Sequence, residues 1–314
     1  MQRWSFPCSR VSLLAFTLCL TFAAIACSHP QPPPAGPHQL LLVTMPDSRA
    51  VAIFAAGTSG DAKPLGTIHE SAPDTPVDAS VNLRGEVFIA NRNGSINIFA
   101  GRNYNYQLVR SLSGPHTQLL HPSSMAVDPM GNMYLADSGA APTPAKIIWI
   151  PAGLNGNIFP ARVVSGPHTG LTSPTGIAVD ASEEVFVADH DSGKILVFAA
   201  DARDDAPPLA TIDGFKGPQR VFIDQDLNLY VSCDGDSSIA VLAPDGPLRW
   251  TRTATITSPT MTSPTGVAAD STGQIAVAVH GAVLYFAAGA NGASAPISEL
   301  QGPAPMNPTG LLIR

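Results

Sequence analysis

The chain has 314 residues, of which 45% are hydrophobic and 13% are charged, and its 24 acidic and 17 basic residues give a net charge of −7. The hydrophobic fraction excludes an intrinsically disordered protein. The negative charge, without any cluster of Lys and Arg, argues against a nucleic acid or an anionic membrane surface as a partner. The 27 Gly and 30 Pro residues are spread along the chain, as is typical of many short strands joined by tight turns.

Residues 1–26 have the features of a signal peptide. Two arginines precede an uncharged, mostly apolar stretch over 11–25 that is too short for a comfortable membrane span. Small residues, Ala24 and Ala26, stand at −3 and −1 before Cys27. This arrangement resembles a bacterial lipobox, although a lipobox usually has Leu where this chain has Ala24. We expect an exported protein, held on the periplasmic or extracellular side of the membrane by a lipid on Cys27, or else secreted.

A Pro-rich segment over 27–38 follows the predicted cleavage site. A stiff, solvated spacer of this kind suits a globular domain that is tethered by an N-terminal lipid. Once the signal peptide is removed, only Cys27 and Cys233 remain. If Cys27 carries a lipid, Cys233 has no disulfide partner, and we expect it to be a small buried residue in a strand.

The rest of the chain, 39–314, is built from an internal repeat. Prolines recur every 44 to 52 residues, each at the start of a short apolar segment: Pro76, Pro122, Pro174, Pro218, Pro264 and Pro308. Each unit continues with a turn, a second apolar strand, a polar loop, a third strand and a weaker fourth strand. Four strands in a period of about 45 residues are the pattern of one blade of a β-propeller.

The two ends of the repeat region predict the number of blades. The first unit lacks its innermost strand and opens directly with the segments 39–45 and 50–54, whereas the last Pro-Thr-Gly segment has no further strand after it. The strand 311–313 should therefore complete blade one. The sequence predicts a single all-β domain, a six-bladed β-propeller with four antiparallel strands per blade and a ring closed by the C-terminal strand in blade one.

The clearest unit reads Pro-Thr-Gly-Ile-Ala-Val-Asp over 174–180, then Val-Phe-Val-Ala-Asp over 185–189 and Ile-Leu-Val-Phe over 195–198. This pattern resembles the NHL repeat, and the resemblance extends over 39–314. It implies the propeller fold but selects no activity, because NHL-type propellers include binding platforms, adaptors and a few enzymes.

Several polar residues invite a metal site, but simpler roles explain them. The Asp residues that end the first strand of a unit are followed by turn residues, and carboxylates in such turns accept backbone N–H groups. Asp189, Asp191, Asp234 and Asp236 resemble fragments of calcium loops but lack a suitably placed Glu. The loop histidines are spread over several blades, so we expect no metal or cofactor.

The second residue after each repeat proline should stand near the central channel. It is Gly in three units, where inner backbones converge, whereas Asp78, Ser124 and Arg220 depart from this rule. Asp78 and Arg220 belong to units three steps apart in a ring of six, so they should face each other across the channel mouth. Two interpretations stay open: the pair fills the channel, or it forms a polar ligand pocket in which Arg220 offers its guanidinium to an anion.

Two functions are compatible with these residues. The first is a non-catalytic binding or scaffolding propeller at the cell envelope, a monomer whose partner is a protein, a glycan or a small anionic ligand. The second is a metal-dependent hydrolase or lyase, as in gluconolactonase-like and streptogramin-lyase-like propellers. A gluconolactonase-like site would require acidic or amide residues at several inner strands, where this chain has one acid and an Arg, and no nucleophile motif is present. The residues therefore favour binding over catalysis.

Overall fold

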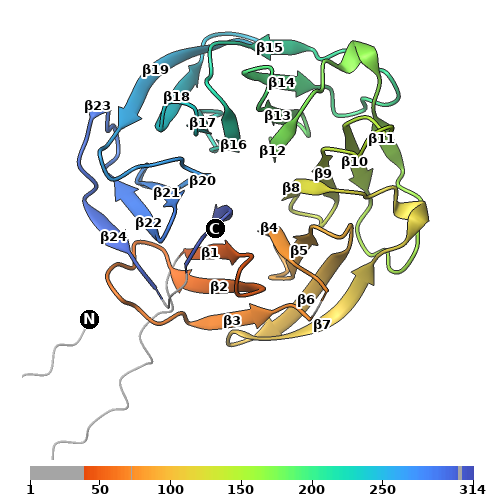
Figure 1. Cartoon of the computed structure of the whole chain (residues 1–314), viewed down its shortest axis with the longest axis horizontal. Helices are drawn as coiled ribbons and strands as arrows, with labels where there is room; N and C mark the ends of the chain where they lie inside the picture. Colours follow the sequence, from red (N-terminus) through yellow and green to blue (C-terminus); the bar gives the residue numbers. More distant parts are fainter. Residues whose placement is uncertain (1–38, 72, 303–305) are drawn as a thin grey trace, which may run out of the picture. The chain divides into compact units, whose positions relative to one another are not determined.

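The computed structural model describes residues 39–71, 73–302 and 306–314. The predicted signal peptide, Cys27 and the Pro-rich tether lie outside these residues. The described chain forms a ring of six β-sheets around a central axis (Figure 1).

Blades one to three take up the first half of the ring. Blade one has the strand order β25-β1-β2-β3 from the axis outward, with β25 (Gly310–Ile313), β1 (Leu40–Met45), β2 (Ala50–Ala55) and β3 (Gly66–His69). Blade two contains β4 (Pro76–Val81), β5 (Val87–Asn91), β6 (Ile96–Arg102) and β7 (Asn105–Leu112). Blade three contains β8 (Pro122–Val127), β9 (Met133–Asp137), β10 (Lys146–Ile150) and β11 (Arg162–Val164).

The second half of the ring follows the same order. Blade four contains β12 (Pro174–Val179), β13 (Val185–Asp189), β14 (Lys194–Phe198) and β15 (Ala210–Ile212). Blade five contains β16 (Pro218–Ile223), β17 (Leu229–Cys233), β18 (Ser238–Pro244) and β19 (Trp250–Thr257). Blade six contains β20 (Gly266–Ala269), β21 (Ile275–Val279), β22 (Ala282–Phe286) and β24 (Ser298–Leu300). Two short 3-10 helices, η1 (Pro115–Thr117) and η2 (Pro167–Thr169), precede blades three and four.

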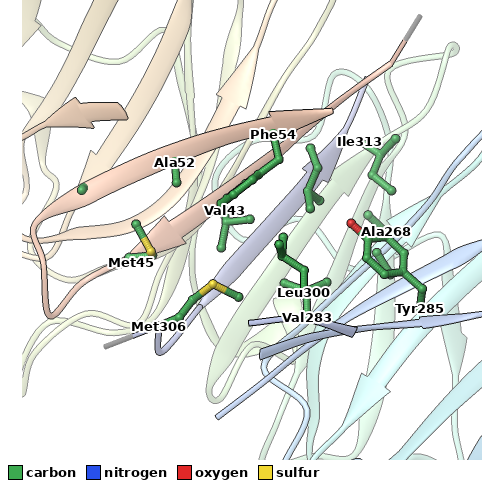
Figure 2. Packing of buried hydrophobic residues seen from close by; sticks show 13 residues of the cluster. Val43, Met45, Ala52, Phe54, Ala268, Val283, Tyr285, Leu300, Met306 and Ile313 are labelled. Atoms are coloured by element: carbon green, nitrogen blue, oxygen red, sulfur yellow. The ribbon is translucent and has the colours of Figure 1, made fainter. Parts of the chain in front are cut away.

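The predicted closure of the ring is confirmed. β25 pairs antiparallel with β1, with Leu41 opposite Ile313 and Thr44 opposite Gly310. Figure 2 shows Ile313 between Phe54 of blade one and Tyr285 of blade six. The C-terminal strand thus joins the first blade and packs against the last, as the incomplete units at the two ends predicted.

Each pair of neighbouring blades shares one hydrophobic cluster, and there are six such clusters around the ring. The middle strands β5, β9, β13, β17 and β21 are buried along their whole length because both faces of each sheet are covered by neighbouring blades. This explains their continuous apolar runs, which differ from the alternating pattern of a sheet with one solvated face.

The outer edges of four blades receive a parallel contact from the connection that follows the third strand of the next blade. The clearest case is β23 (Gly292–Ala293), which pairs parallel with β19 and adds a fifth strand to the sheet of blade five. Single bridges do the same at Gly60 with Leu300, Gly156 with Leu112, and Asp204 with Val164. These contacts occupy backbone groups that an edge strand would otherwise leave open.

Candidate functional site

The structure brings together the three residues that the sequence singled out. Asp78 on β4, Ser124 on β8 and Arg220 on β16 meet at the axis and form a polar layer, which we call the channel plug. Ser124 Oγ donates to Asp78 Oδ2 at 2.6 Å, and the guanidinium Nε of Arg220 lies 3.9 Å from the same oxygen. The predicted encounter of Asp78 and Arg220 across the channel therefore occurs.

The plug is held by backbone groups from several blades. Asp78 Oδ2 accepts the backbone N–H of Met125 at 3.0 Å, and Asp78 Oδ1 accepts that of Ala79 at 2.9 Å. The guanidinium of Arg220 donates to the carbonyl oxygens of Thr175 and of Val77, the latter at 3.3 Å. The plug thus links blades two, three, four and five.

Burial lowers the pKa of Arg220, and the Asp78 carboxylate opposes this shift. The side chain stays cationic because guanidinium ordinarily titrates far above neutral pH. Its Nε is buried without a hydrogen-bond partner, so the charge at the axis is only partly compensated.

Glycines at the equivalent positions of other blades leave room for this layer. A Cβ on Gly310 would stand 2.5 Å from Asp78 Oδ1, and a Cβ on Gly176 would stand 2.8 Å from the Cα of Arg220. At Gly176 and Gly310 the inner strands of neighbouring blades therefore approach one another too closely for a side chain, as the glycines of the repeat predicted.

Arg220 lines two cavities, one on each side of the plug. The cavity at the end where the inner strands begin has a volume of about 570 Å³, and we call it the mouth cavity. The other, of about 180 Å³, is lined by Asp78, Ser124 and mostly apolar residues of the inner strands, such as Phe222 and Leu312. The mouth cavity is the larger of the two and most of its lining residues have polar side chains, so it is the better candidate for ligand binding.

The wall of the mouth cavity comes from the first residue after each repeat proline: Val77, Ser123, Thr175, Gln219, Thr265 and Thr309. In blades two to five the strand register shifts at this residue, so that two residues of the inner strand face one residue of its partner. Such a bulge turns a side chain out of the normal alternation. The wall residue of these four blades therefore faces the channel instead of packing between sheets.

The hydroxyl groups of this wall also connect the blades. Ser123, Thr175 and Thr265 each donate to the carbonyl of the repeat proline in the following blade, at 2.6, 2.8 and 2.6 Å. The oxygen lone pairs of these three hydroxyl groups can still accept hydrogen bonds, and the contacts with the next blade hold the hydroxyl groups in place.

Positive charge gathers in the mouth cavity. Arg92, which follows β5, and His121, which precedes β8, line it together with Arg220, whereas none of its described lining residues is Asp or Glu. Arg92 takes part in none of the ion pairs found among the described residues. In a protein with net charge −7, two guanidinium groups in the lining of one cavity, those of Arg92 and Arg220, favour an anion.

A hydrogen-bonded chain stands beside the cavity wall. Gln219 Nε2 donates to Asp234 Oδ2 at 2.8 Å, and Asp234 Oδ1 lies 3.2 Å from His190 Nε2. Asp191 Oδ1 contacts the other ring nitrogen at 2.7 Å. The hydrogen bond with Asp191, followed by the charge of Asp234, raises the pKa of His190 against the effect of burial.

The other polar residues noted in the sequence have structural roles. Asp128 Oδ1 accepts three backbone N–H groups of its own turn, and the equivalent Asp residues of blades four to six do the same with two. His116 stacks on Phe159 with ring centroids 4.3 Å apart, and His168 contacts Asp205 at 2.6 Å. Cys233 is buried, and burial raises the pKa of its thiol to about 11. Among the described residues, no three His, Cys, Asp or Glu side chains converge as metal ligands.

The sequence alone did not predict that the six wall residues line one cavity. It also did not predict that Arg92 and His121 belong to the same lining. A signal was present, because Thr follows the repeat proline in three of the six units. A hydroxyl group that recurs beside the axis indicates a polar wall. The bulge that turns this residue toward the channel, however, cannot be recognised from the pattern of hydrophobic residues.

In the part of the chain that the structure covers, no helix combines the length and the apolar character needed to cross a bilayer. No protein-family model matches the chain, and no curated protein does either. The resemblance to the NHL repeat therefore stays a prediction.

Solved structures share the architecture at low sequence identity. The periplasmic gluconolactonase of Pseudomonas aeruginosa is 14% identical, with a TM-score of 0.64 over 88% of this chain and 98% of that one. A putative 6-phosphogluconolactonase of Bacteroides fragilis is 13% identical, with a TM-score of 0.60 over 90% and 100%. The virginiamycin B lyase of Staphylococcus aureus is 15% identical, with a TM-score of 0.50 over 75% and 73%. At these identities the likeness shows the β-propeller fold and no more.

Proposed function

We propose that this protein binds a small anionic ligand in the mouth cavity. The observation that carries the proposal is the lining of that cavity, which combines Arg92, Arg220 and His121 with no described carboxylate. A volume of about 570 Å³ falls within the usual range of small-molecule sites.

The lining residues of the mouth cavity would make different contacts with a bound anion. Arg92 is exposed and free of an ion pair among the described residues, so its planar guanidinium can meet a carboxylate or phosphate through two hydrogen bonds. Arg220 supplies a fixed positive charge at the floor, since most of its N–H groups already contact backbone carbonyls. Gln219 and the wall hydroxyls offer further polar contacts to a ligand that carries hydroxyl groups.

Calorimetric titration of small carboxylates, sugar acids and inorganic phosphate tests this proposal. We expect Arg92→Gln to weaken the binding of an anion by about tenfold to a hundredfold, the value of one charged hydrogen bond. Arg84→Gln is the control, because Arg84 is an exposed arginine in the turn between β4 and β5, at the opposite end of the strands. If no anion binds, or if every anion that binds does so equally well to wild type and Arg92→Gln, the proposal is wrong.

A metal-dependent hydrolase or lyase is the second candidate. It is supported by the activities named for the two lactonase-type structures and the lyase, which share this fold. Turnover of a sugar lactone by the purified protein, abolished by a chelator and restored by a divalent cation, would favour this candidate over simple binding.

We also propose that the protein is exported and anchored to the membrane by a lipid on Cys27, so that it binds its ligand at the cell envelope. They are supported by the apolar stretch over 11–25, by Cys27 after two small residues and by the Pro-rich segment that follows. Mass spectrometry should find a diacylglyceryl group on Cys27, and Cys27→Ser should release the protein from membranes. A wild-type protein that is wholly soluble, with a free Cys27 thiol, would leave secretion as the remaining explanation.

A further inference from the structure

The side-chain hydroxyl groups around the mouth cavity all donate their protons to the protein itself. Five residues of the lining carry such a group, which we call the lining hydroxyls, and each donates to a backbone carbonyl: Ser123, Ser138, Thr175, Thr265 and Thr309. A hydroxyl group has one proton and two lone pairs. The lining hydroxyls can therefore accept a hydrogen bond from a ligand without losing a contact of their own.

Three of the lining hydroxyls stand between two carbonyl oxygens. Ser123 Oγ lies 2.6 Å from Pro174 O of the next blade and 3.2 Å from Ala136 O of its own blade. Thr175 Oγ1 has the same two kinds of neighbour at 2.8 and 3.3 Å, and Thr265 Oγ1 has them at 2.6 and 3.5 Å. A ligand with only acceptor atoms would have to draw the proton away from the contact between two blades, whereas a ligand O–H or N–H group would leave that contact in place.

The wall offers few other uncharged donors. The backbone N–H groups of Thr265 and Thr309 already donate to carbonyls of adjacent strands at 3.0 Å. Gln219 Nε2 donates to Asp234 Oδ2, and this fixes the orientation of the amide because a carboxylate only accepts. The amide then offers a ligand its Oε1 as an acceptor and one remaining N–H as a donor.

The cationic donor of the rim and the lining hydroxyls belong to different parts of the ring. Arg92 comes from blade two, whereas Thr175 and Thr265 come from blades four and six, two steps away on either side. An anion that carries O–H or N–H groups on the rest of its skeleton fits this arrangement. Its charged group can contact the guanidinium of Arg92 while its donors reach the hydroxyl oxygens.

We propose that the mouth cavity selects anions that carry O–H or N–H donors over anions that carry only acceptors, and that the lining hydroxyls make this selection. The inference rests on the proposed binding of an anion in this cavity and adds the class of ligand. Specificity of this kind is a difference between two affinities. It arises here because the lining hydroxyls accept a hydrogen bond at no loss and donate one only by breaking another.

The test compares two carboxylates of the same skeleton in calorimetric titrations of the purified protein. Protocatechuate is a dihydroxybenzoate with two O–H donors, and veratrate is its dimethyl ether, in which both donors are replaced by ether oxygens. We expect protocatechuate to bind about tenfold more tightly, which is the effect of one or two hydrogen bonds between uncharged groups.

Thr265→Val removes one lining hydroxyl with little change in the size of the side chain. It should reduce the preference for protocatechuate by about threefold to tenfold and leave the affinity for veratrate unchanged. Thr272→Val is the control, because Thr272 is an exposed threonine in the turn between β20 and β21, at the opposite end of the same blade. If Thr265→Val fails to fold, Ser138→Ala answers the same question, because Ser138 is exposed.

Two results would overturn this inference alone. In the first, veratrate binds as tightly as protocatechuate, so that the cavity holds anions without selecting donors. In the second, neither Thr265→Val nor Ser138→Ala reduces the preference, which would place the selection outside the lining hydroxyls. If neither carboxylate binds and no other anion does, the proposed function fails and this inference fails with it.

Discussion

Deletion of residues 308–314 should destroy the closure of the ring. This change removes β25, whose four residues pair with β1, and it removes the backbone hydrogen bonds between Leu40 and Arg314 at 2.6 and 2.9 Å. It also exposes the buried residues Leu41 and Val43 of β1 along an open strand edge.

The expected loss is comparable to the whole stability of the domain. Ile313 is buried at 7% exposure and Leu312 is half-buried, and a fully buried Leu or Ile contributes about 1.5–3 kcal/mol. Each lost hydrogen bond adds about 1 kcal/mol. The loss is therefore on the order of 5–10 kcal/mol, against about 5–15 kcal/mol for a typical native protein.

Urea unfolding followed by circular dichroism, together with gel filtration, measures this effect. The truncated protein should aggregate or unfold at low urea, and Ile313→Ala should give a partial loss of about 2–5 kcal/mol. Leu83→Ala is the control, because Leu83 is 74% exposed and its loss should cost less than about 0.5 kcal/mol. A truncated protein that unfolds at the same urea concentration as the parent would refute the closure argument.

Three further predictions concern the axis and its surroundings. Asp78→Ala should destabilise the fold by about 3–5 kcal/mol in urea unfolding, because it leaves Arg220 and two backbone N–H groups without an acceptor. Asp78→Asn should cost less, and equal losses for the two variants would argue against the plug. Gly176→Ala should cost about 1–3 kcal/mol, since its Cβ would stand 2.8 Å from Gln219 O, and an unchanged midpoint would contradict this. Because the pKa of His190 is raised in the folded protein, its protonated ring should stabilise the fold below about pH 6.5, and this stabilisation should be lost as the pH rises through the folded pKa. An NMR titration that gives His190 an ordinary or lowered pKa would contradict this prediction.

The fold was readable from the sequence because each blade repeats the same local signals. The repeat prolines, the turn Asp residues and the continuous apolar runs of strands such as Val185–Asp189 each have a local cause, and all of them recur where predicted. The meeting of Asp78 with Arg220 was also predictable, because position in a closed ring follows from counting the units.

The mouth cavity was less predictable because its lining depends on a bulge. Counting along an ordinary strand puts the second residue after the proline at the axis and assigns the first to a sheet face. The register shift turns the first residue, such as Thr175, toward the cavity and leaves the second, such as Arg220, in the plug below it. Arg92 and His121 come from loops, whose direction no periodic pattern fixes.

Blade two departs from the repeat at the axis and contributes residues to both the plug and the mouth cavity. Blade two supplies Asp78 to the plug and Arg92 to the mouth cavity, and it has Asn91 where blades three and four have Asp137 and Asp189. Arg92 directly follows Asn91, and its backbone N–H donates to Thr75 O at 2.9 Å, next to Asp74. A repeat protein can change one unit without disturbing the others, because each blade contacts only its neighbours. Under the proposed function, the contribution of blade two to anion recognition is Arg92, and the contacts between the other blades do not depend on this side chain.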